Sequence, residues 1–565
     1  MGWCRRSSWL VLGVAMAIAT GAGCSKDAPP TPTVPTSVVE TEVPAPATLL
    51  AEVSIPTPNA TWAKLQRNIG GVVGILPSSF GGLVATLTGL ELGFADEVDG
   101  VAPAYAALGA PAVEGSAVSF VIATKLVELR RVRALLLAGD TSKFKAREEG
   151  SLTYLTGPTK DYAMALTASG YLLVGGSEAD IAALGPYAYR TLPKRAPANE
   201  AVVVTVPKAS LRGPLRSQLL ASWAHFMAEK LEQDEQMRKA HGGRAPDFAD
   251  PKGILSVLDA VVQKRAQLLE HLDGATLRVE TLDTRLRGTV SLSGAAADPV
   301  VKSGLVDRST GDASTLLGAP SDAAISLFFH DDAAEREKRV EDLVADVGAV
   351  FGKRLGDAET KRARDIAAAW SKARGDALRC DVYWADQKHL GLQTQGGKAD
   401  ELDRAGAATV DLLRAPFFKE PLKLKSLDAK PQELSGQKMQ TARMVRTGKN
   451  LWFDALEGAW GTKDGVSGVV IGDAAAAFLS STWAPPKRLG DDPEIAAMVK
   501  DLGSRCSFAL VARPSVFDPR KPDPVGPPVV VGWGCDAAKA GEAGFGRVEM
   551  TYPLARELIR HFSGL

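Results

Sequence analysis

Histidine and acidic side chains are the groups with which this chain could most directly bind a metal ion or transfer a proton. The six histidines are scattered, and no two stand at the spacing that places both imidazoles on one helical face. His330 is followed by Asp331 and Asp332, which together could bind a cation or act as a base. Short acceptor side chains directly before a helix are typical caps, and a helix is expected from Ala333. The sequence thus predicts a helix cap here and no metal site.

Glycine-rich segments and serines are the next candidates for chemistry. Gly175 and Gly176 follow an expected strand, as do Gly472 and Asp473, but neither pair belongs to a GxGxxG fingerprint or a P-loop. The segment around Ser177 does not match the GxSxG elbow of serine hydrolases. The sequence therefore predicts no catalytic residue and no cofactor. A hydrolase whose residues meet from distant segments stays open as an alternative.

Two of the later cysteines stand in mirror positions around a proline-rich loop. Residues 507–513 and 528–534 are expected to form the two arms of a hairpin, which places Cys506 and Cys535 opposite each other. Opposed residues are close enough for a disulfide, and exported proteins can oxidise such a pair. Separately buried thiols are the alternative. Cys380, in a strand-like segment, is predicted to be a small buried hydrophobe.

Cys24 follows an N-terminal segment with the layout of a secretory signal peptide. Arg5 and Arg6 give a basic start, and residues 9–19 form an apolar stretch that is too short for a stable transmembrane helix. Small residues then lead to Cys24, whose thiol can take a diacylglyceryl group. This segment resembles a bacterial lipobox, with Gly21 standing where a leucine or similar residue is usual. Ordinary signal cleavage is the alternative.

The resemblance implies a lipoprotein that is held on a membrane by acyl chains, palmitate among them, on Cys24. Each buried methylene contributes about 0.8 kcal/mol, so several chains together hold firmly. Ser25 after the cysteine implies, by the same resemblance, the outer membrane of a Gram-negative bacterium. Residues 27–48 are rich in proline and threonine and cannot bury a core, so we expect an extended tether.

The overall charge argues against nucleic acid as a partner. Lysine and arginine number 66, and aspartate and glutamate also number 66, so the net charge is zero. A neutral chain exerts no long-range attraction on nucleic acid or on anionic lipid. No later apolar run approaches the ~20 residues that a membrane span needs. We therefore expect no nucleic-acid binding, and only the N-terminal segment to belong to a membrane.

Strand-like segments repeatedly run into helix-like segments across a proline, a glycine or a short polar residue. Residues 49–55 and 201–206 are examples. Residues 162–174 and 275–293 read as hairpins, which require antiparallel pairing. A purely parallel sheet would leave these hairpins unexplained. We predict an α+β fold with antiparallel-dominated mixed sheets and repeated strand-to-helix units.

Long helical signals organise the rest of the chain. Residues 215–239 and 254–272 flank a segment that contains glycine and proline, and they predict a helical hairpin that joins two main lobes. Further helices are predicted over residues 333–351, 357–373 and 398–414. We expect four parts: a signal peptide (1–23), the lipidated Cys24 with its tether (24–47), an N-terminal α+β lobe that includes the helical hairpin (48–272), and a C-terminal α+β lobe (273–565).

These observations predict a non-catalytic, membrane-anchored lipoprotein with a binding or structural ectodomain. The layout is similar to that of uncharacterised bacterial lipoproteins with strand-to-helix repeats. An envelope protein or a glycan is the expected partner, and the aromatic cluster of residues 451–453 with Trp460 is a candidate groove for it. An envelope hydrolase and a periplasmic carrier of lipid or another apolar ligand are the alternatives.

Overall fold

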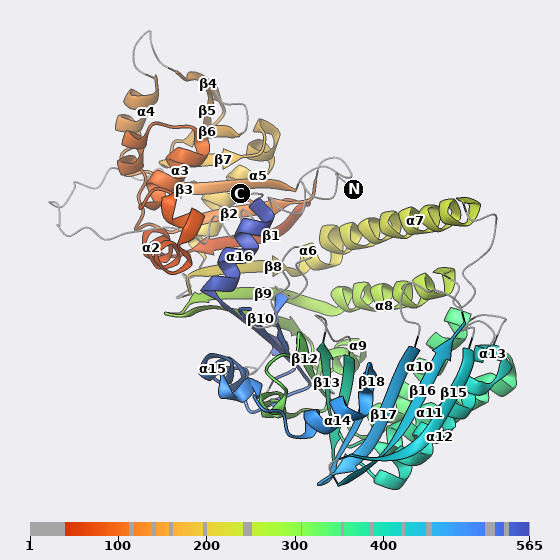
Figure 1. Cartoon of the computed structure of the whole chain (residues 1–565). Coiled ribbons are helices and arrows are strands. Elements are labelled where there is room, and N and C mark those ends of the chain that lie inside the picture. Colours follow the sequence, from red (N-terminus) through yellow and green to blue (C-terminus); the bar gives the residue numbers. More distant parts are fainter. Residues whose placement is uncertain are drawn as a thin grey trace. The chain divides into compact units, whose positions relative to one another are not determined.

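The chain folds into two compact units, each built around a run of antiparallel strands (Figure 1). Unit 1 comprises Met1–Gln218, Leu269–Ala295 and Met550–Leu565, and unit 2 comprises Leu219–Leu268 and Ala296–Glu549. The computed structural model describes residues 40–563 except for residues 112–117, 138–142, 158–161, 196–199, 241–250, 307, 352–354, 384–388, 420–423, 435, 448–454, 515–525 and 536–541. The large antiparallel sheet and the many helices confirm the predicted α+β class.

The sheet of unit 1 has the strand order β10-β9-β8-β1-β2-β3-β7-β6-β5-β4, and each neighbouring pair is antiparallel. Its strands are β1 (Leu49–Ile55), β2 (Ala104–Gly109), β3 (Ser119–Lys125), β4 (Lys145–Glu149), β5 (Leu152–Thr156), β6 (Ala163–Thr167), β7 (Tyr171–Gly175), β8 (Val202–Pro207), β9 (Leu272–Thr281) and β10 (Arg285–Gly294). Both predicted hairpins, β6–β7 and β9–β10, are part of this ladder. The β6–β7 turn places Gly170 at φ +77°, a conformation that glycine adopts without strain.

Helices cover both faces of the unit 1 sheet. On one face, Ile181 of α5 (Glu178–Arg190) packs with Ala107 and Val121. On the other face, α3 (Phe80–Thr88) and α4 (Leu129–Leu137) pack against alternate strand residues. The Ser177 hydroxyl accepts a hydrogen bond from the Asp180 amide at 3.1 Å and so caps α5. The glycine-containing segment after β7 is thus a helix start.

A separate cluster joins the helix that follows β1 to the helix at the end of the described chain. Trp62, on α2 (Pro58–Ile69), is fully buried and packs with Tyr552 of α16 (Tyr552–Ser563). The Trp62 indole donates a hydrogen bond to the Pro77 carbonyl at 2.7 Å. Proline in the first turn of α2 suits the helix start because no backbone donor is needed there.

The sheet of unit 2 has the order β21-β20-β12-β13-β14-β18-β17-β16-β15, again with antiparallel neighbours. Its strands are β12 (Ile325–His330), β13 (Ala377–Tyr383), β14 (His389–Gln395), β15 (Leu424–Leu434), β16 (Gln437–Arg446), β17 (Ala455–Lys463), β18 (Val466–Gly472), β20 (Phe508–Ala512) and β21 (Val529–Trp533). A small sheet pairs β11 (Gly311–Asp312) with β19 (Arg505–Cys506), and β22 (Glu542–Thr551) follows β21. The main helices are α10 (Ala333–Phe351), α11 (Asp357–Ala373), α12 (Ala399–Arg414), α14 (Ala475–Trp483) and α15 (Pro493–Asp501).

The two sheets have the same topology. If β1, β2, β3 and β8 of unit 1 are matched with β12, β13, β14 and β20 of unit 2, and β4–β7 with β15–β18, every neighbour relation in unit 2 has its counterpart in unit 1. The helices agree as well. Two follow the first strand in each unit, α4 follows the third strand of unit 1, α12 and the short α13 (Pro416–Lys419) follow that of unit 2, and α5 and α14 follow the equivalent strands β7 and β18. The repeated strand-to-helix units in the sequence therefore reflect two structural copies of one fold.

The predicted helical hairpin is present as α7 (Arg216–Ala240) and α8 (Pro251–His271). It leaves from β8 and returns to β9, and these strands are neighbours in one sheet, so the two helices are an insertion between paired strands. Within unit 2, the Trp223 indole donates to the Asp259 carboxylate at 2.8 Å and ties the helices together. The predicted boundary near Asp273 falls inside β9.

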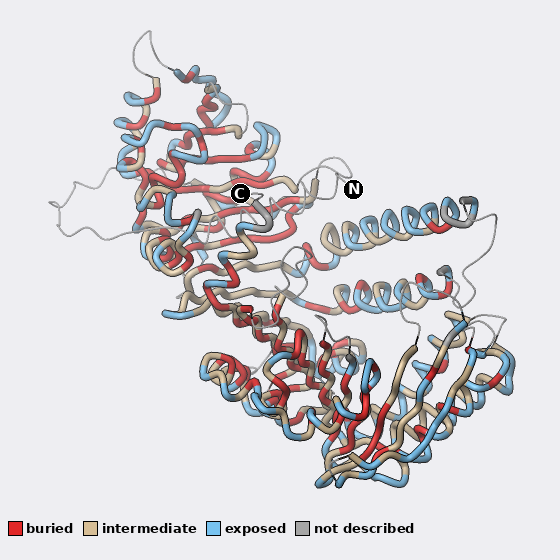
Figure 2. The backbone as a smooth tube through the Cα atoms, viewed as in Figure 1, coloured by how far each residue is buried: buried red, intermediate tan, exposed pale blue. Residues whose placement is uncertain are grey.

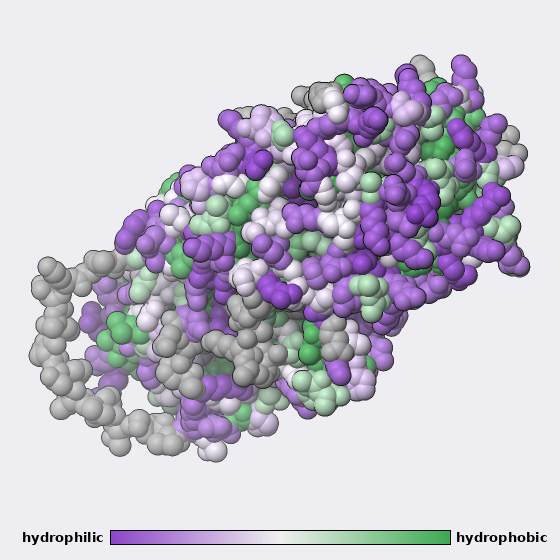
Figure 3. Space-filling model, turned by 90° about the horizontal axis from the view of Figure 1, so that it is seen from below, coloured by the Kyte–Doolittle hydropathy of each residue, from purple (hydrophilic) through white to green (hydrophobic). Residues whose placement is uncertain are grey.

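Buried residues are concentrated in the central strands of each sheet (Figure 2). On the face shown in Figure 3, hydrophilic and hydrophobic residues are interspersed over short distances. Among the described residues, no helix combines the length and the apolar content that a membrane crossing requires.

Candidate functional site

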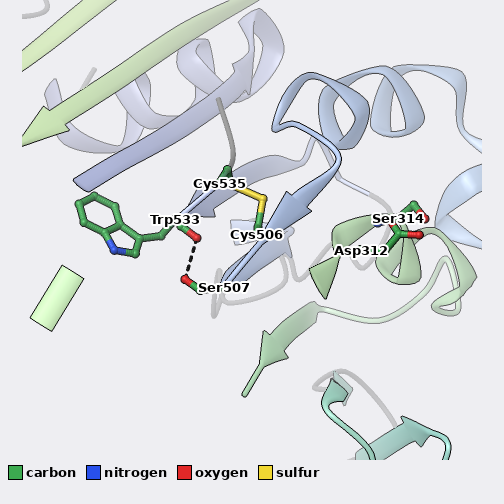
Figure 4. The surroundings of a disulfide bond; sticks show 6 residues. All are labelled: Asp312, Ser314, Cys506, Ser507, Trp533 and Cys535. Carbon is green, nitrogen blue, oxygen red and sulfur yellow. Dashed lines mark hydrogen bonds between the residues drawn. A yellow bond between two sulfur atoms is a disulfide. The ribbon is translucent and has the colours of Figure 1, made fainter. Parts of the chain in front are cut away.

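The predicted site cysteines fall in two different parts of the chain. Cys24 lies outside the described residues. Cys506 and Cys535 form a disulfide with an S–S distance of 2.16 Å (Figure 4). The β20–β21 ladder sets this geometry, since Phe508 is opposite Trp533 and each cysteine lies two residues further along its arm. The Ser507 hydroxyl donates to the Trp533 carbonyl at 3.0 Å, across the same end of the hairpin.

The acidic pair after His330 divides between two structural roles. Asp332 accepts a hydrogen bond from the Glu335 amide at 2.9 Å and caps α10, as predicted. Asp331 does not cap the helix. It is fully buried and accepts two hydrogen bonds from Arg374, at 2.7 and 2.6 Å. Arg339 Nη1 lies 3.3 Å from Asp331 Oδ2 and forms a second ion pair. Within the described residues no group of three or more potential ligands could hold a metal ion.

The aromatic cluster that was a candidate groove is described only in part. Residues 451–453 lie outside the described residues. Trp460 is 6% exposed and packs against α12, where a Cβ atom on Gly406 would lie 2.3 Å from the indole ring. The close approach of α12 to the sheet therefore needs glycine at position 406. Trp460 is a core residue of unit 2, which removes it from the predicted groove.

A cavity of about 430 Å³ opens at one end of the unit 2 sheet. It lies between the first residues of β13, the last residues of β14, the β17–β18 turn and the C-terminal end of α14. The turn is Asp464-Gly465, both with positive φ, a pair favoured in two-residue hairpin loops. Trp483, the last residue of α14, forms one wall above Gly468, where a Cβ atom would lie 3.3 Å from the indole nitrogen.

Three buried polar side chains lie on adjacent strands beneath this cavity. Arg379 and Asp381 are 6% and 1% exposed, and Gln393 is 7% exposed. Arg379 Nε donates to Asp381 Oδ2 at 2.9 Å, and Arg379 Nη2 donates to Gln393 Oε1 at 2.6 Å. Arg379 and Gln393 are directly paired in the β13–β14 register and therefore share one face. Both line the cavity.

Burial raises the pKa of Asp381 above its ordinary value, and the adjacent Arg379 guanidinium opposes the rise. On the opposite face of β13, burial first and the Asp381 charge second raise the pKa of the Cys380 thiol to about 11. Cys380 is half-buried and is the free cysteine among the described residues. A thiol with so high a pKa is a poor nucleophile at neutral pH.

The equivalent face of unit 1 has a different chemical character. On β2 and β3, the side chains that face α5 include Ala107, Val121 and Ala123, all buried, with Tyr105 at the edge of the same cluster. None of these four is charged, but the same face of unit 1 also carries the buried Glu52 of β1, which lies opposite Ala107 and pairs with Arg195. The two copies therefore differ in which strands carry the buried charges: β1 in unit 1, and β13 in unit 2.

No known family model matches the sequence, and no curated protein matches it significantly. Among solved structures, the chain is similar to TP0453 in its crystal form III, with 10% identity and a TM-score of 0.22, over 44% of this chain and 97% of that one. Crystal form I of TP0453 gives 11% identity and a TM-score of 0.19, over 44% and 96%. Likenesses of this size carry no functional argument.

The sequence offered one overlooked signal for this cavity. Arg379 and Asp381 stand at alternate positions of the strand-like segment LRCDVYW, so both must point to the same face of a sheet. Charged pairs inside an otherwise apolar strand indicate a buried ion pair. Gln393 gave no comparable signal, because its role depends on the pairing of β13 with β14.

Proposed function

We propose that this protein is a lipoprotein of the bacterial cell envelope whose folded part binds a partner and does not catalyse a reaction. The observation that carries the proposal is Cys24, a thiol preceded by small residues and a short apolar leader. Ser25 supports the outer membrane of a Gram-negative bacterium as the location. Residues 25–39 would then connect the lipid to the folded part.

The first described residues support a tether that ends on unit 1. Glu40 forms an ion pair with Arg190, at 2.7 Å between Oε2 and Nε, near the end of α5. The Val43 amide donates to the Thr191 hydroxyl at 3.0 Å, and that hydroxyl donates back to the Val43 carbonyl at 2.8 Å. The part of the predicted tether from Glu40 onward is therefore held against the fold. At ~3.1 Å per residue, residues 25–39 would reach about 50 Å if extended.

The cavity in unit 2 supports binding rather than hydrolysis. Its described lining contains no histidine, serine or cysteine. Its threonine hydroxyls are engaged as donors, since Thr394 donates to the Ala377 carbonyl and Thr482 to the Leu479 carbonyl, both at 2.8 Å. A hydrolase would need a nucleophile and a base within hydrogen-bond reach. The polar lining also favours a polar ligand over the lipid that an apolar carrier would hold.

The test is membrane attachment of a Cys24→Ser variant, with Cys4→Ser as the matched control because it removes the other cysteine of the leader. We expect the parent chain and the Cys4→Ser variant in the membrane pellet and in the detergent phase, and the Cys24→Ser variant in the aqueous phase. Mass spectrometry of the mature N-terminus should show acyl chains on Cys24. A Cys24→Ser variant that stays with the membrane, or an unmodified Cys24 in the parent, would contradict the proposal.

A further inference from the structure

The orientation of the Gln393 side chain leaves a hydrogen-bond donor without a partner beneath the cavity. Arg379 can only donate, so the end of the Gln393 amide that faces it must be the oxygen. Nε2 is then fixed at the other end, and it is buried with no hydrogen-bond partner. Trp483 Nε1, on the cavity wall, is likewise buried and unpartnered. Buried polar groups are normally paired, so two unpaired donors in one lining indicate an acceptor that is present when the site is filled.

The charges of the lining set the charge of that acceptor. Arg379 is neutralised by Asp381, with which it is hydrogen-bonded. Of the other charged residues that line the cavity, Lys463 and Arg488 are cationic and Asp464 is anionic, which leaves one positive charge. Within the described part of the chain, neither the Lys463 nor the Arg488 side chain forms an ion pair, and the Asp491 carboxylate accepts a hydrogen bond from the Arg488 backbone amide at 2.8 Å. One excess positive charge beside donors that lack acceptors suits a singly charged anion.

We propose that this cavity binds a small organic molecule through one carboxylate group, which accepts hydrogen bonds from Gln393 and Trp483 and lies near Lys463. The proposal deepens the binding role proposed above and rests on it. A carboxylate offers acceptor oxygens only, which matches a lining whose unpaired groups are both donors. A phosphate monoester would bring close to two negative charges against one positive charge.

The rest of the lining indicates an uncharged body behind the carboxylate. Val466, Pro485 and the Trp483 ring contribute apolar surface around the polar groups. A volume of about 430 Å³ falls in the usual range of ~300 to 1,000 Å³ for small-molecule sites. The ligand class is therefore an aliphatic or aromatic monocarboxylic acid.

The duplicated fold gives an independent reason to assign a function to these residues. The counterparts of β13 and β14 in unit 1 form a stable face from alanine, valine and tyrosine side chains. The buried charge on this face of unit 1 is Glu52 of β1, which pairs with Arg195, so folding does not require a buried arginine, aspartate or glutamine on the counterparts of β13 and β14. Burying an ion pair is at best weakly stabilising relative to apolar residues of similar size. Their presence in unit 2 is explained by the ligand.

The test measures binding of monocarboxylates to the full chain purified in detergent. The probes are hexanoate, benzoate, phenylacetate and N-acetylphenylalanine, each compared with its primary amide, and phenyl phosphate, with ligand-observed NMR as the readout. We expect at least one carboxylate to bind with a dissociation constant below about 10 mM, and its amide to bind at least tenfold more weakly. Gln393→Leu should weaken that carboxylate at least tenfold, because a hydrogen bond to a charged group is lost.

Matched variants separate the site from general effects. Lys463→Gln should weaken the carboxylate several-fold, whereas Lys500→Gln on α15 and Gln432→Leu on β15 should leave binding unchanged. The proposal is overturned if no carboxylate binds, if the amides or phenyl phosphate bind as tightly, or if Gln393→Leu and Lys463→Gln have no effect. A Cys24→Ser chain should bind the carboxylate as the parent does. Loss of carboxylate binding with an intact lipid anchor would therefore refute this inference and leave the envelope assignment standing.

Discussion

Replacing Arg379 by methionine tests the ion pair that supports the floor of the unit 2 cavity. The variant keeps an unbranched apolar side chain but leaves the Asp381 carboxylate, 1% exposed, without its cationic partner. Removing one partner of a buried pair typically costs about 3 to 5 kcal/mol, because the other charge stays desolvated. We expect a loss of this size in the free energy of unfolding of unit 2 at pH 8.

The loss should depend on pH in a direction that the environment of Asp381 fixes. Burial already raises the pKa of Asp381 in the parent, and Arg379 is the group that opposes the rise. Without Arg379 the folded-state pKa rises further above its unfolded value. The folded state then binds the proton more tightly than the unfolded state, so stability is present at low pH and is lost as pH rises through the folded pKa. The slope for one proton is at most about 1.4 kcal/mol per pH unit.

The assay is urea unfolding of the parent and the variant at pH 5 and pH 8, followed by tryptophan fluorescence. The transition of unit 1 serves as an internal reference, since none of its residues is changed. The double variant Arg379→Met with Asp381→Leu should recover most of the lost stability, because it removes the isolated charge. An equal loss at both pH values, or a double variant as unstable as the single one, would refute the reasoning.

Two further predictions concern the cysteines of unit 2. The pKa of the Cys380 thiol is raised to about 11, so at pH 8 Cys380 should contain about a hundredfold less thiolate than a thiol with an ordinary pKa. Alkylation by iodoacetamide should therefore be slow until the chain is unfolded in urea. Mass spectrometry that finds Cys380 labelled as fast in the folded chain as in the unfolded chain would contradict this. The Cys506–Cys535 disulfide closes a separation of 29 residues, and replacing both cysteines with alanine should lower the free energy of unfolding of unit 2 by about 3 to 4 kcal/mol; a loss below about 1 kcal/mol would show that the loop is already restricted in the unfolded chain.

Local structure could be predicted from the sequence where neighbouring residues decide it. The helix predicted over residues 357–373 is α11, Asp357–Ala373, with Asp357 and Glu359 in its first turn, where acidic side chains favour a helix start. The β9–β10 and β6–β7 hairpins were likewise predictable, because short turn segments separate their arms.

The order of the strands could not be predicted in the same way. The pairing of β3 with β7, and of β14 with β18, joins segments separated by a helix and further strands. Such pairings depend on burial across the sheet and not on nearby residues. The two copies of the fold also share no residue identities at a fixed period, so their common topology appears only in the strand order.

The cavity was missed for a related reason. Arg379 and Gln393 are 14 residues apart, and their contact exists only because β13 and β14 pair in one particular register. Trp483 and Lys463 come from segments later in the chain and complete the lining. The acidic residues considered first for chemistry have structural roles instead. Asp332 caps the start of α10, and Asp331 forms a buried ion pair with Arg374.

The composition of unit 1 from three separated segments has a consequence for the order of folding. Residues 550–565 supply α16, whose Tyr552 completes the cluster around Trp62 on the first helix of the unit. A chain that emerges with its N-terminus first, from a ribosome or an export channel, releases all of unit 2 before this last piece arrives. The cluster around Trp62 can therefore close only after Tyr552 has been released, and truncation before Tyr552 should leave Trp62 without that packing partner.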